Sequence, residues 1–387
     1  MSVATFVGYD SDLTTYSLAA PNVTPSASHA GVRSTIGYQI RSDKVAFSTR
    51  GAVDSRYYHM ESPLQANSFS GGTSLSTTVT SRLNVDASFT TMYSPRFVLA
   101  VMPVADDIEL NLTPALDYGL SAEKLLSHSA SGNARFQVSR RSFLHASGSR
   151  GTQRLLDQNY NVTTHSWGGG YSYSATRYTT MRLGYREQVS HYPSPIGLDS
   201  QYTYRTLDAG VNYSRPLSIS RRTTMSISTG SAAYANTTET FYTVTASASL
   251  NHEINRTWVA NVVYARGLSV VAGFPEPFFT DSVTGTIQGQ LARNVTLVGN
   301  TGLSNGHVGL GSATNNYDSF QATARLEWTV KPDRIGVYGN YFYYAYEFDQ
   351  PPTALTPVPR QMNRNGFSAG LMFRFPLLKE RTSRVTR

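Results

Sequence analysis

Apolar and polar residues alternate strictly over residues 319–330. The even positions are Phe320, Ala322, Ala324, Leu326, Trp328 and Val330, and the odd positions are all polar or charged. Successive side chains of a β-strand point to opposite faces, so this alternation predicts a strand with one apolar face and one face toward water. A turn at 331–334 and a second segment, 335–348, rich in Tyr, Phe and Val, complete a predicted hairpin.

Hairpins of this kind recur along the whole chain. Strands are predicted at 3–9, 32–41, 45–53, 69–79, 85–93, 126–138, 143–155, 167–173, 181–189, 207–213, 225–233, 242–250, 258–264, 283–291, 297–303, 319–330, 335–348 and 367–375. Connections of about three to eight residues alternate with loops of about ten to thirty, a pattern typical of transmembrane barrels. The sequence therefore predicts an all-β, antiparallel, up-and-down transmembrane barrel of about 18 strands, with 16 as the alternative.

Soluble all-β folds also contain many short strands. A β-propeller has strands of about five to six residues, and each of its blades would repeat a sequence signature, which this chain lacks. A sandwich needs no aromatic residues at the strand ends, whereas a membrane barrel carries them as an interfacial girdle. The predicted girdle comprises Tyr93, Tyr173, Tyr213, Trp258, Tyr264, Trp328 and Phe348.

Composition is compatible with a barrel in the cell envelope. Only 15% of the 387 residues are charged, cysteine is absent, and the mean hydropathy is -0.29. A transmembrane barrel can have this mean hydropathy because half of each strand faces water. We expect residues 1–376 to form one barrel domain, 94–124 a long acidic loop within it, and 377–387 a basic tail. The first residues show no basic or apolar signal-peptide region, so we expect this numbering to describe a mature chain.

Several short motifs accompany the strand pattern: residues 7–12 (VGYDSD), 139–142 (SRRS), 219–223 (ISRRT) and 255–258 (NRTW). With this layout the chain resembles bacterial outer-membrane β-barrel porins associated with exosortase and exopolysaccharide systems. The resemblance implies a place in the outer membrane, with lipid, lipopolysaccharide and the barrel-assembly machinery as partners. Such barrels commonly end on an aromatic residue. Phe373 and Phe375 fit that role, although a basic tail follows them.

Charged residues on the predicted water-facing sides of the strands are candidates for the lining of a pore. They are Arg33, Arg41, Arg50, Asp54, Asp86, Arg135, Arg182, Arg186, Asp208, Arg325, Glu327 and Arg374. A wall rich in arginine would favour anionic solutes. Alternatively, these side chains pair across strands and only stiffen the wall, as the spacing of Arg325 and Glu327 on one face suggests.

The irregular segment 105–123 carries the acidic residues Asp106, Asp107, Glu109 and Asp117. One hypothesis is a constriction loop that folds into the lumen and meets the basic wall. The alternative is a loop on the cell surface, because long loops commonly lie there.

Other chemistry finds little support. His145 and Ser147 share a strand face, but no third catalytic group falls at a telling position, so we do not expect an enzyme. The histidines lack metal-ligand spacing, and no cofactor or nucleic-acid motif is present, so the net charge of +8 is interpreted as a solvated basic rim.

The predicted function is passive diffusion of small hydrophilic solutes, anions included, or of a polysaccharide strand. The alternative is a structural or secretion-associated barrel with an occluded lumen. The sequence leaves the oligomeric state open.

Overall fold

The computed structural model describes residues 1–11, 26–59, 64–94, 124–156, 160–192, 200–213, 222–235, 240–269, 274, 276–309, 314–331, 334–351 and 359–375. The segment that contains Asp106, Asp107, Glu109 and Asp117 lies outside these residues, so the hypothesis of a constriction loop stays a prediction. No helix in the described part of the chain is long and apolar enough to cross a membrane.

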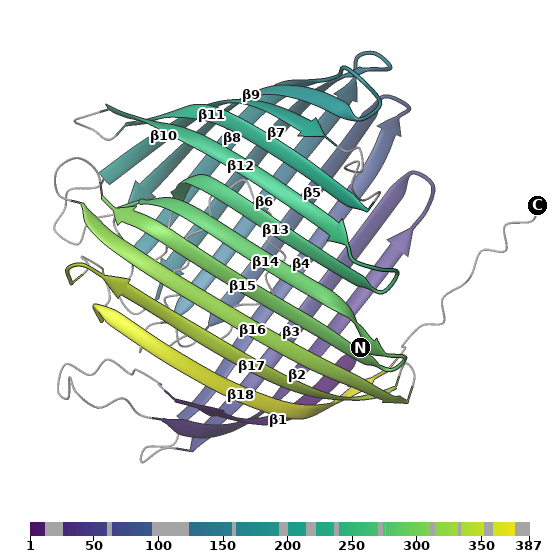
Figure 1. Ribbon diagram of the computed structural model, residues 1–387, viewed down its shortest axis with the longest axis vertical. Coiled ribbons are helices and arrows are strands. Elements are labelled where there is room, and N and C mark those ends of the chain that lie inside the picture. Colours follow the sequence, from purple (N-terminus) through teal and green to yellow (C-terminus); the bar gives the residue numbers. More distant parts are fainter. Residues whose placement is uncertain are drawn as a thin grey trace, which may run out of the picture.

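The described residues form a closed barrel of antiparallel strands (Figure 1). Its strands are β1 (Ser2–Asp10), β2 (Ala27–Arg41), β3 (Val45–His59), β4 (Leu64–Thr80), β5 (Leu83–Ser94), β6 (Leu125–Gln137), β7 (Ser142–Leu155), β8 (Tyr160–Ser174), β9 (Thr179–Tyr192), β10 (Ser200–Tyr213), β11 (Thr223–Ala235), β12 (Thr240–Glu253), β13 (Trp258–Ser269), β14 (Phe278–Ala292), β15 (Val295–Val308), β16 (Asn315–Lys331), β17 (Ile335–Phe348) and β18 (Gln361–Arg374). Each strand pairs with its neighbours in sequence, and β1 also pairs with β18. The predicted up-and-down barrel of about 18 strands is confirmed.

Most strands are longer than their alternating cores predicted. For example, β8 begins at Tyr160 and β18 at Gln361, whereas alternation predicted starts at 167 and 367. The extra length lies at the ends where the sequence predicted the long loops. The strands take up residues expected to belong to those loops, so the connections 60–63, 156–159 and 236–239 contain only four residues each, fewer than the ten to thirty expected for this rim. We call this end of the barrel the upper end and the end of the short turns the lower end.

The barrel closes where β1 meets β18. Nine residues of β1 pair with β18, from Ser2 with Arg374 to Asp10 with Gly366, and the same nine pair with β2. At the lower end the amino group of Met1 donates a hydrogen bond to the carbonyl of Phe375 at 3.0 Å. The first and last strands are therefore paired along the whole length of β1, which closes the barrel there.

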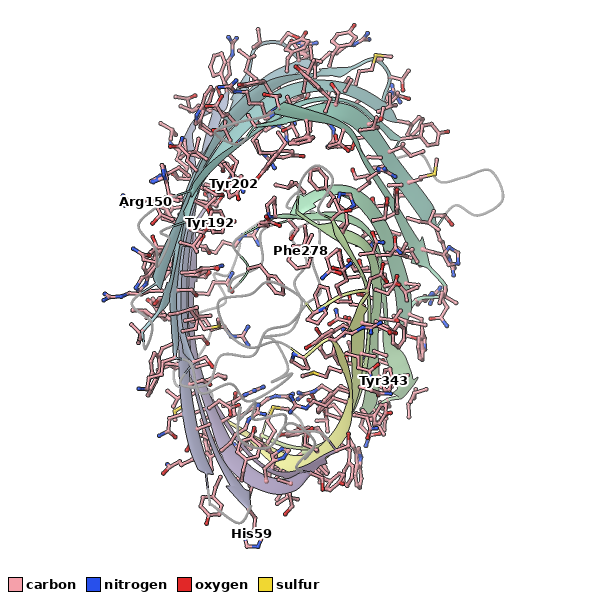
Figure 2. All side chains as sticks on the ribbon, turned by 90° about the vertical axis from the view of Figure 1, so that its left-hand side faces the viewer. His59, Arg150, Tyr192, Tyr202, Phe278 and Tyr343 are labelled. Atoms are coloured by element: carbon pink, nitrogen blue, oxygen red, sulfur yellow. The ribbon has the colours of Figure 1, made fainter. Side chains whose placement is uncertain are left out.

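The junction between β12 and β13 is different. Its ladder contains eight pairs and ends at Ala246 with Arg266. Above that point, residues 240–245 pair only with β11, and residues 267–269 pair only with β14. Figure 2 shows the upper end of β14, marked by Phe278, inside the ring of strands.

Candidate functional site

Figure 2 separates the two faces of the barrel wall: Phe278 lies inside, whereas Arg150 and His59 point outward. Because directly paired residues of antiparallel strands share a face, the register carries this assignment around all strands. The register places every candidate pore residue on the inner face: Arg33, Arg41, Arg50, Asp54, Asp86, Arg135, Arg182, Arg186, Asp208, Arg325, Glu327 and Arg374. Their role as the lining of a conducting pore stays a prediction.

Two clusters on the inner face each join two arginines to one carboxylate. In the first, Asp54 accepts hydrogen bonds from Arg33 at 2.6 Å and from Arg56 at 2.8 Å. Asp54 is buried, so both guanidinium groups are held against the wall. With two arginines and one carboxylate, each cluster carries one uncompensated positive charge.

The second cluster lies on β16 and β18. Glu327 interacts with Arg325 at 3.5 Å and also with Arg374. The guanidinium group of Arg325 lies 4.6 Å from the centre of the Tyr338 ring, a cation–π geometry. Both arginines are about one-third exposed, so they face the lumen.

The remaining candidates divide into paired and unpaired side chains. Arg182 lies 3.7 Å from Asp208, and Arg135 lies 4.0 Å from the centre of the Phe143 ring. Arg41 and Arg50 form no ion pair with any described residue. The predicted pairing across the wall is therefore present for several residues, yet arginines still outnumber carboxylates on the inner face.

Sequence analysis missed one ion pair at the closure. Arg364 of β18 donates two hydrogen bonds to Asp10 of β1, one of them at 2.5 Å, and the two side chains are 1% and 3% exposed. Both residues lie on the inner face, so continuing the alternation of the first and last predicted strands outward by a few residues would have identified the pair.

Aromatic rings cover glycines beside the closure. The ring of Phe6 lies over Gly31, where an added Cβ would come within 2.5 Å of it. Tyr338 covers Gly370 in the same way, with its hydroxyl 2.9 Å from the position of an added Cβ. Glycine is needed here because the rings pack directly on the backbone. These contacts give the inner wall at the closure a layer of rings flanked by the two arginine clusters.

One prediction for the aromatic girdle is wrong. Phe348 is completely buried on the inner face, where it packs with Phe274 and Tyr317. The alternation of β17 places the even-numbered residues inside, and Phe348 continues that series. Phe278 joins the same group, which fills part of the upper lumen. The other predicted girdle residues lie on the outer face: Tyr93, Tyr173, Tyr213, Trp258, Tyr264 and Trp328.

A carboxylic acid lies near a second aromatic group in the upper lumen. Tyr192 and Tyr202 pack together, and Tyr202 stacks on Tyr234 at 5.8 Å between ring centres. Glu276, in the connection between β13 and β14, is close enough to Tyr234 to interact with it electrostatically. Burial raises the pKa of Glu276, because it disfavours the charged carboxylate. This part of the lumen is therefore lined by tyrosine rings beside one half-buried carboxyl group.

The outer face is apolar over most of its height. Large side chains more than half exposed on this face include Val7, Ile36, Leu183, Leu207, Leu303 and Phe367. Glu187 interrupts this surface, but it accepts hydrogen bonds from Arg205 at 2.9 Å and from Tyr185 at 2.8 Å. Arg150 points outward as well, and its long side chain can place the charge away from the apolar band. Soluble monomers rarely expose so continuous an apolar surface.

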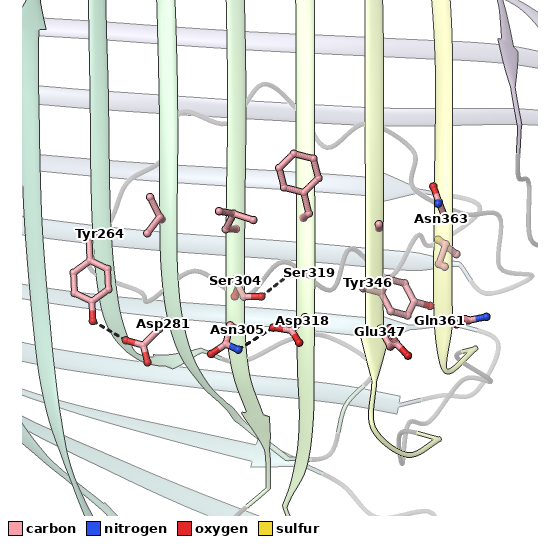
Figure 3. Close-up of a pocket in the computed structure, with 15 residues that line it drawn as sticks. Tyr264, Asp281, Ser304, Asn305, Asp318, Ser319, Tyr346, Glu347, Gln361 and Asn363 are labelled. Atoms are coloured by element: carbon pink, nitrogen blue, oxygen red, sulfur yellow. Dashed lines mark hydrogen bonds between the residues drawn. The ribbon is translucent and has the colours of Figure 1, made fainter.

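A polar row crosses the outer face near the upper end. It runs directly from strand to strand through Arg266, Asp281, Asn305, Asp318, Glu347 and Gln361. Tyr264 donates a hydrogen bond to Asp281 at 2.6 Å and Asn305 donates one to Asp318 at 2.8 Å (Figure 3). Below it, an apolar floor that includes Leu303 and Phe320 completes a concavity of about 880 Å³. This row marks the upper boundary of the apolar surface.

Comparison with known proteins gives no family. No family model matches the chain, and no curated protein matches it. The resemblance to exosortase-associated porins therefore stays a prediction.

Solved structures share the barrel architecture only loosely. The siderophore receptor PirA from Acinetobacter baumannii is 8% identical, with a TM-score of 0.43 over 97% of this chain and 80% of that chain. OccAB3 from Acinetobacter baumannii is 9% identical, with a TM-score of 0.42 over 97% of this chain and 99% of that chain. The ferric citrate transporter FecA is 10% identical, with a TM-score of 0.39 over 95% of this chain and 63% of that chain. These values are too low to transfer a function.

Proposed function

We propose that the chain is a bacterial outer-membrane pore for passive diffusion of small hydrophilic solutes, with anions favoured. The observation that carries this proposal is a closed barrel with an apolar outer face and an arginine-rich inner face. In lipid every backbone N–H and C=O group must pair within the protein, and a closed barrel meets that requirement along most of its wall. A band of exposed apolar side chains suits contact with lipid and not with water.

The size of the barrel supports an aqueous passage. Barrels of about eight strands are filled by their own side chains, whereas those of about 16 to 18 can leave a channel. This barrel has eighteen strands, and its inner face carries the two arginine clusters around Asp54 and Glu327.

The preference for anions rests on the two arginine clusters. Asp54 and Glu327 each neutralise only one of two bound arginines. A net positive wall raises the local concentration of anions and opposes the entry of cations. The clusters also fix their side chains, so the positive charges stay at defined places along the wall.

A second candidate function is a scaffold with a closed lumen. The packing of Phe274, Phe278, Tyr317 and Phe348 inside the upper barrel favours it, because these rings occupy space that a solute would need. A scaffold of this kind would serve envelope machinery through its rims and would conduct no ions.

Recording from the purified protein in a planar lipid bilayer under a salt gradient separates the two functions. We expect discrete conductance steps and a reversal potential that indicates preference for chloride over potassium. Preference for potassium would contradict the anion assignment while leaving the pore intact. Absence of conductance after insertion, checked by protease protection in the same membranes, would contradict the pore and favour the scaffold.

A further inference from the structure

The β12–β13 ladder is the shortest in the described barrel. It ends at Ala246 with Arg266, although β12 continues upward to Thr240 and β13 to Ser269. Residues 240–245 therefore present an edge of the sheet with no strand partner on the β13 side. Unpaired backbone groups are costly at a membrane, so a barrel would not be expected to leave such an edge without a reason.

Above the end of this ladder the wall overlaps itself. Leu268 belongs to the outer face of β13, yet it is only 3% exposed. Phe279, on the outer face of β14, has its ring 6.0 Å from that of Tyr234, which lies on the inner face of β11 and is 1% exposed. The outer face of upper β13 and β14 therefore lies against the inner face of β11, and Figure 2 shows the end of β14 inside the ring of strands.

The same residues can also form a continuous wall. Continuing the register of the ladder upward by two residues would pair Thr245 with Gly267 and Val244 with Leu268. Val244 and Leu268 would then both point outward, as their positions in the alternation require. Two arrangements thus compete for one segment: the overlap, in which Leu268 is buried in the lumen, and the extended ladder, in which the edge is paired.

The surfaces at this junction suit an amphipathic molecule. Residues 240–245 (TFYTVT) carry no charge, and Tyr242 and Val244 are 82% and 58% exposed on the outer side. On the lumen side the junction meets Tyr202 and Tyr234, rings that carry hydroxyl groups. A fully hydrophilic solute would gain nothing by leaving the lumen here, whereas a molecule with an apolar chain would gain contact with lipid.

We propose that the β12–β13 junction is a lateral gate through which amphipathic molecules pass between the lumen and the lipid around the barrel. In the overlap, β12 and β13 are separated above Ala246, and an apolar chain can take the place of Leu268 and Phe279 beside β11. In the extended ladder the wall is continuous and the route is shut. This inference rests on the proposed membrane location and adds a sideways route to the axial pore.

The gate can be shut with a disulfide, since the chain has no cysteine of its own. In the double variant Val244→Cys/Leu268→Cys the two thiols would be directly opposite only in the extended ladder, within the range that a disulfide requires. The protein is placed in liposomes, and transfer of a fluorescent single-chain amphiphile from the surrounding solution to the bilayer is measured beside flux of a hydrophilic anionic dye. We expect oxidation to reduce amphiphile transfer to the level of protein-free liposomes, dye flux to be kept or increased, and reductant to restore transfer.

The matched control is Leu250→Cys/Val262→Cys, a pair on the same two strands and the same face that is already opposite in the ladder. Its disulfide should change neither measurement. Failure of the Val244→Cys/Leu268→Cys disulfide to form, while both thiols react with maleimide, would overturn the extended ladder. Unchanged amphiphile transfer after the disulfide forms would overturn the route. Absence of dye flux in every variant would count against the axial pore alone, because cross-linking still reports on the gate.

Discussion

Two junctions of the barrel wall differ in how completely their strands pair, and the junction between strands that are distant in sequence is the more completely paired. β1 and β18 lie at opposite ends of the chain, yet they pair along all nine residues of β1. β12 and β13 are joined by a short turn, yet their ladder ends after eight pairs, and six residues of β12 have no partner on that side. Connection by a short turn fixes where a ladder begins, but not how far it extends.

Packing on the inner face explains the difference. At the closure, a buried ion pair between Arg364 and Asp10 joins β18 directly to β1. The rings over Gly31 and Gly370 join β1 to β2 and β17 to β18, and so support the strands on either side. At the β12–β13 junction the comparable contact, Tyr234 with Phe279, joins two strands that are not neighbours. The first set of contacts holds a ladder closed, whereas the second holds it apart.

The largest expected effect comes from breaking the buried ion pair. Arg364→Gln leaves the carboxylate of Asp10 buried without its guanidinium partner, which typically costs about 3–5 kcal/mol. We expect the free energy of unfolding in detergent micelles, measured with urea, to fall by that amount. Heat-modifiable migration in gels should be lost at a lower temperature.

The matched control is Arg360→Gln, from an ion pair with Glu347 at 3.9 Å near the same rim. Both of its side chains are more than half exposed, so a loss below about 1 kcal/mol is expected. Equal losses for the two variants would mean that burial at the closure contributes nothing special to the stability of the barrel.

The strands and their closure into a barrel could be predicted from the sequence, whereas the overlap above the β12–β13 ladder could not. Strict alternation in stretches such as 319–330 indicates which residues share a face, and that is enough to predict strands, their approximate number and a barrel. Phe348 was misassigned because an aromatic residue at a strand end has the same appearance whether it faces lipid or the lumen. The early end of the β12–β13 ladder leaves no local signal, since residues 242–245 alternate apolar and polar side chains as a paired strand does.

The next largest effect concerns glycine at the closure. In Gly370→Ala the new methyl group would meet the Tyr338 hydroxyl and the backbone of Thr5, an overpacking that costs about 1–3 kcal/mol. Gly339→Ala, on the neighbouring strand, introduces a methyl group with no atom within 4 Å and should be neutral or slightly stabilising. Urea unfolding of both variants checks this. Similar stability of the two would show that the Tyr338 ring and the backbone of Thr5 shift easily to admit the methyl group.

A smaller effect on stability but a clear effect on selectivity is expected for Glu327→Gln. The change frees Arg325 and Arg374, both part-exposed to the lumen beside the closure, so the inner wall becomes more positive. The reversal potential in a salt gradient should shift further toward chloride. Arg374→Gln should shift it the other way. Glu347→Gln, on the outer face, serves as the control and should leave it unchanged.

The smallest expected effect tests the β12–β13 junction. The hydroxyl of Tyr234 is buried with no hydrogen-bond partner among the described residues, so Tyr234→Phe removes a polar group that the overlap leaves unsatisfied. The overlap should therefore become more stable by less than about 1 kcal/mol, and the Val244→Cys/Leu268→Cys disulfide should form more slowly in this background. Tyr171→Phe, on the outer face of β8, is the control and should leave the rate unchanged. A faster rate in Tyr234→Phe would mean that the hydroxyl stabilises the overlap, and the junction would then be held apart by a polar contact as the closure is held together by one.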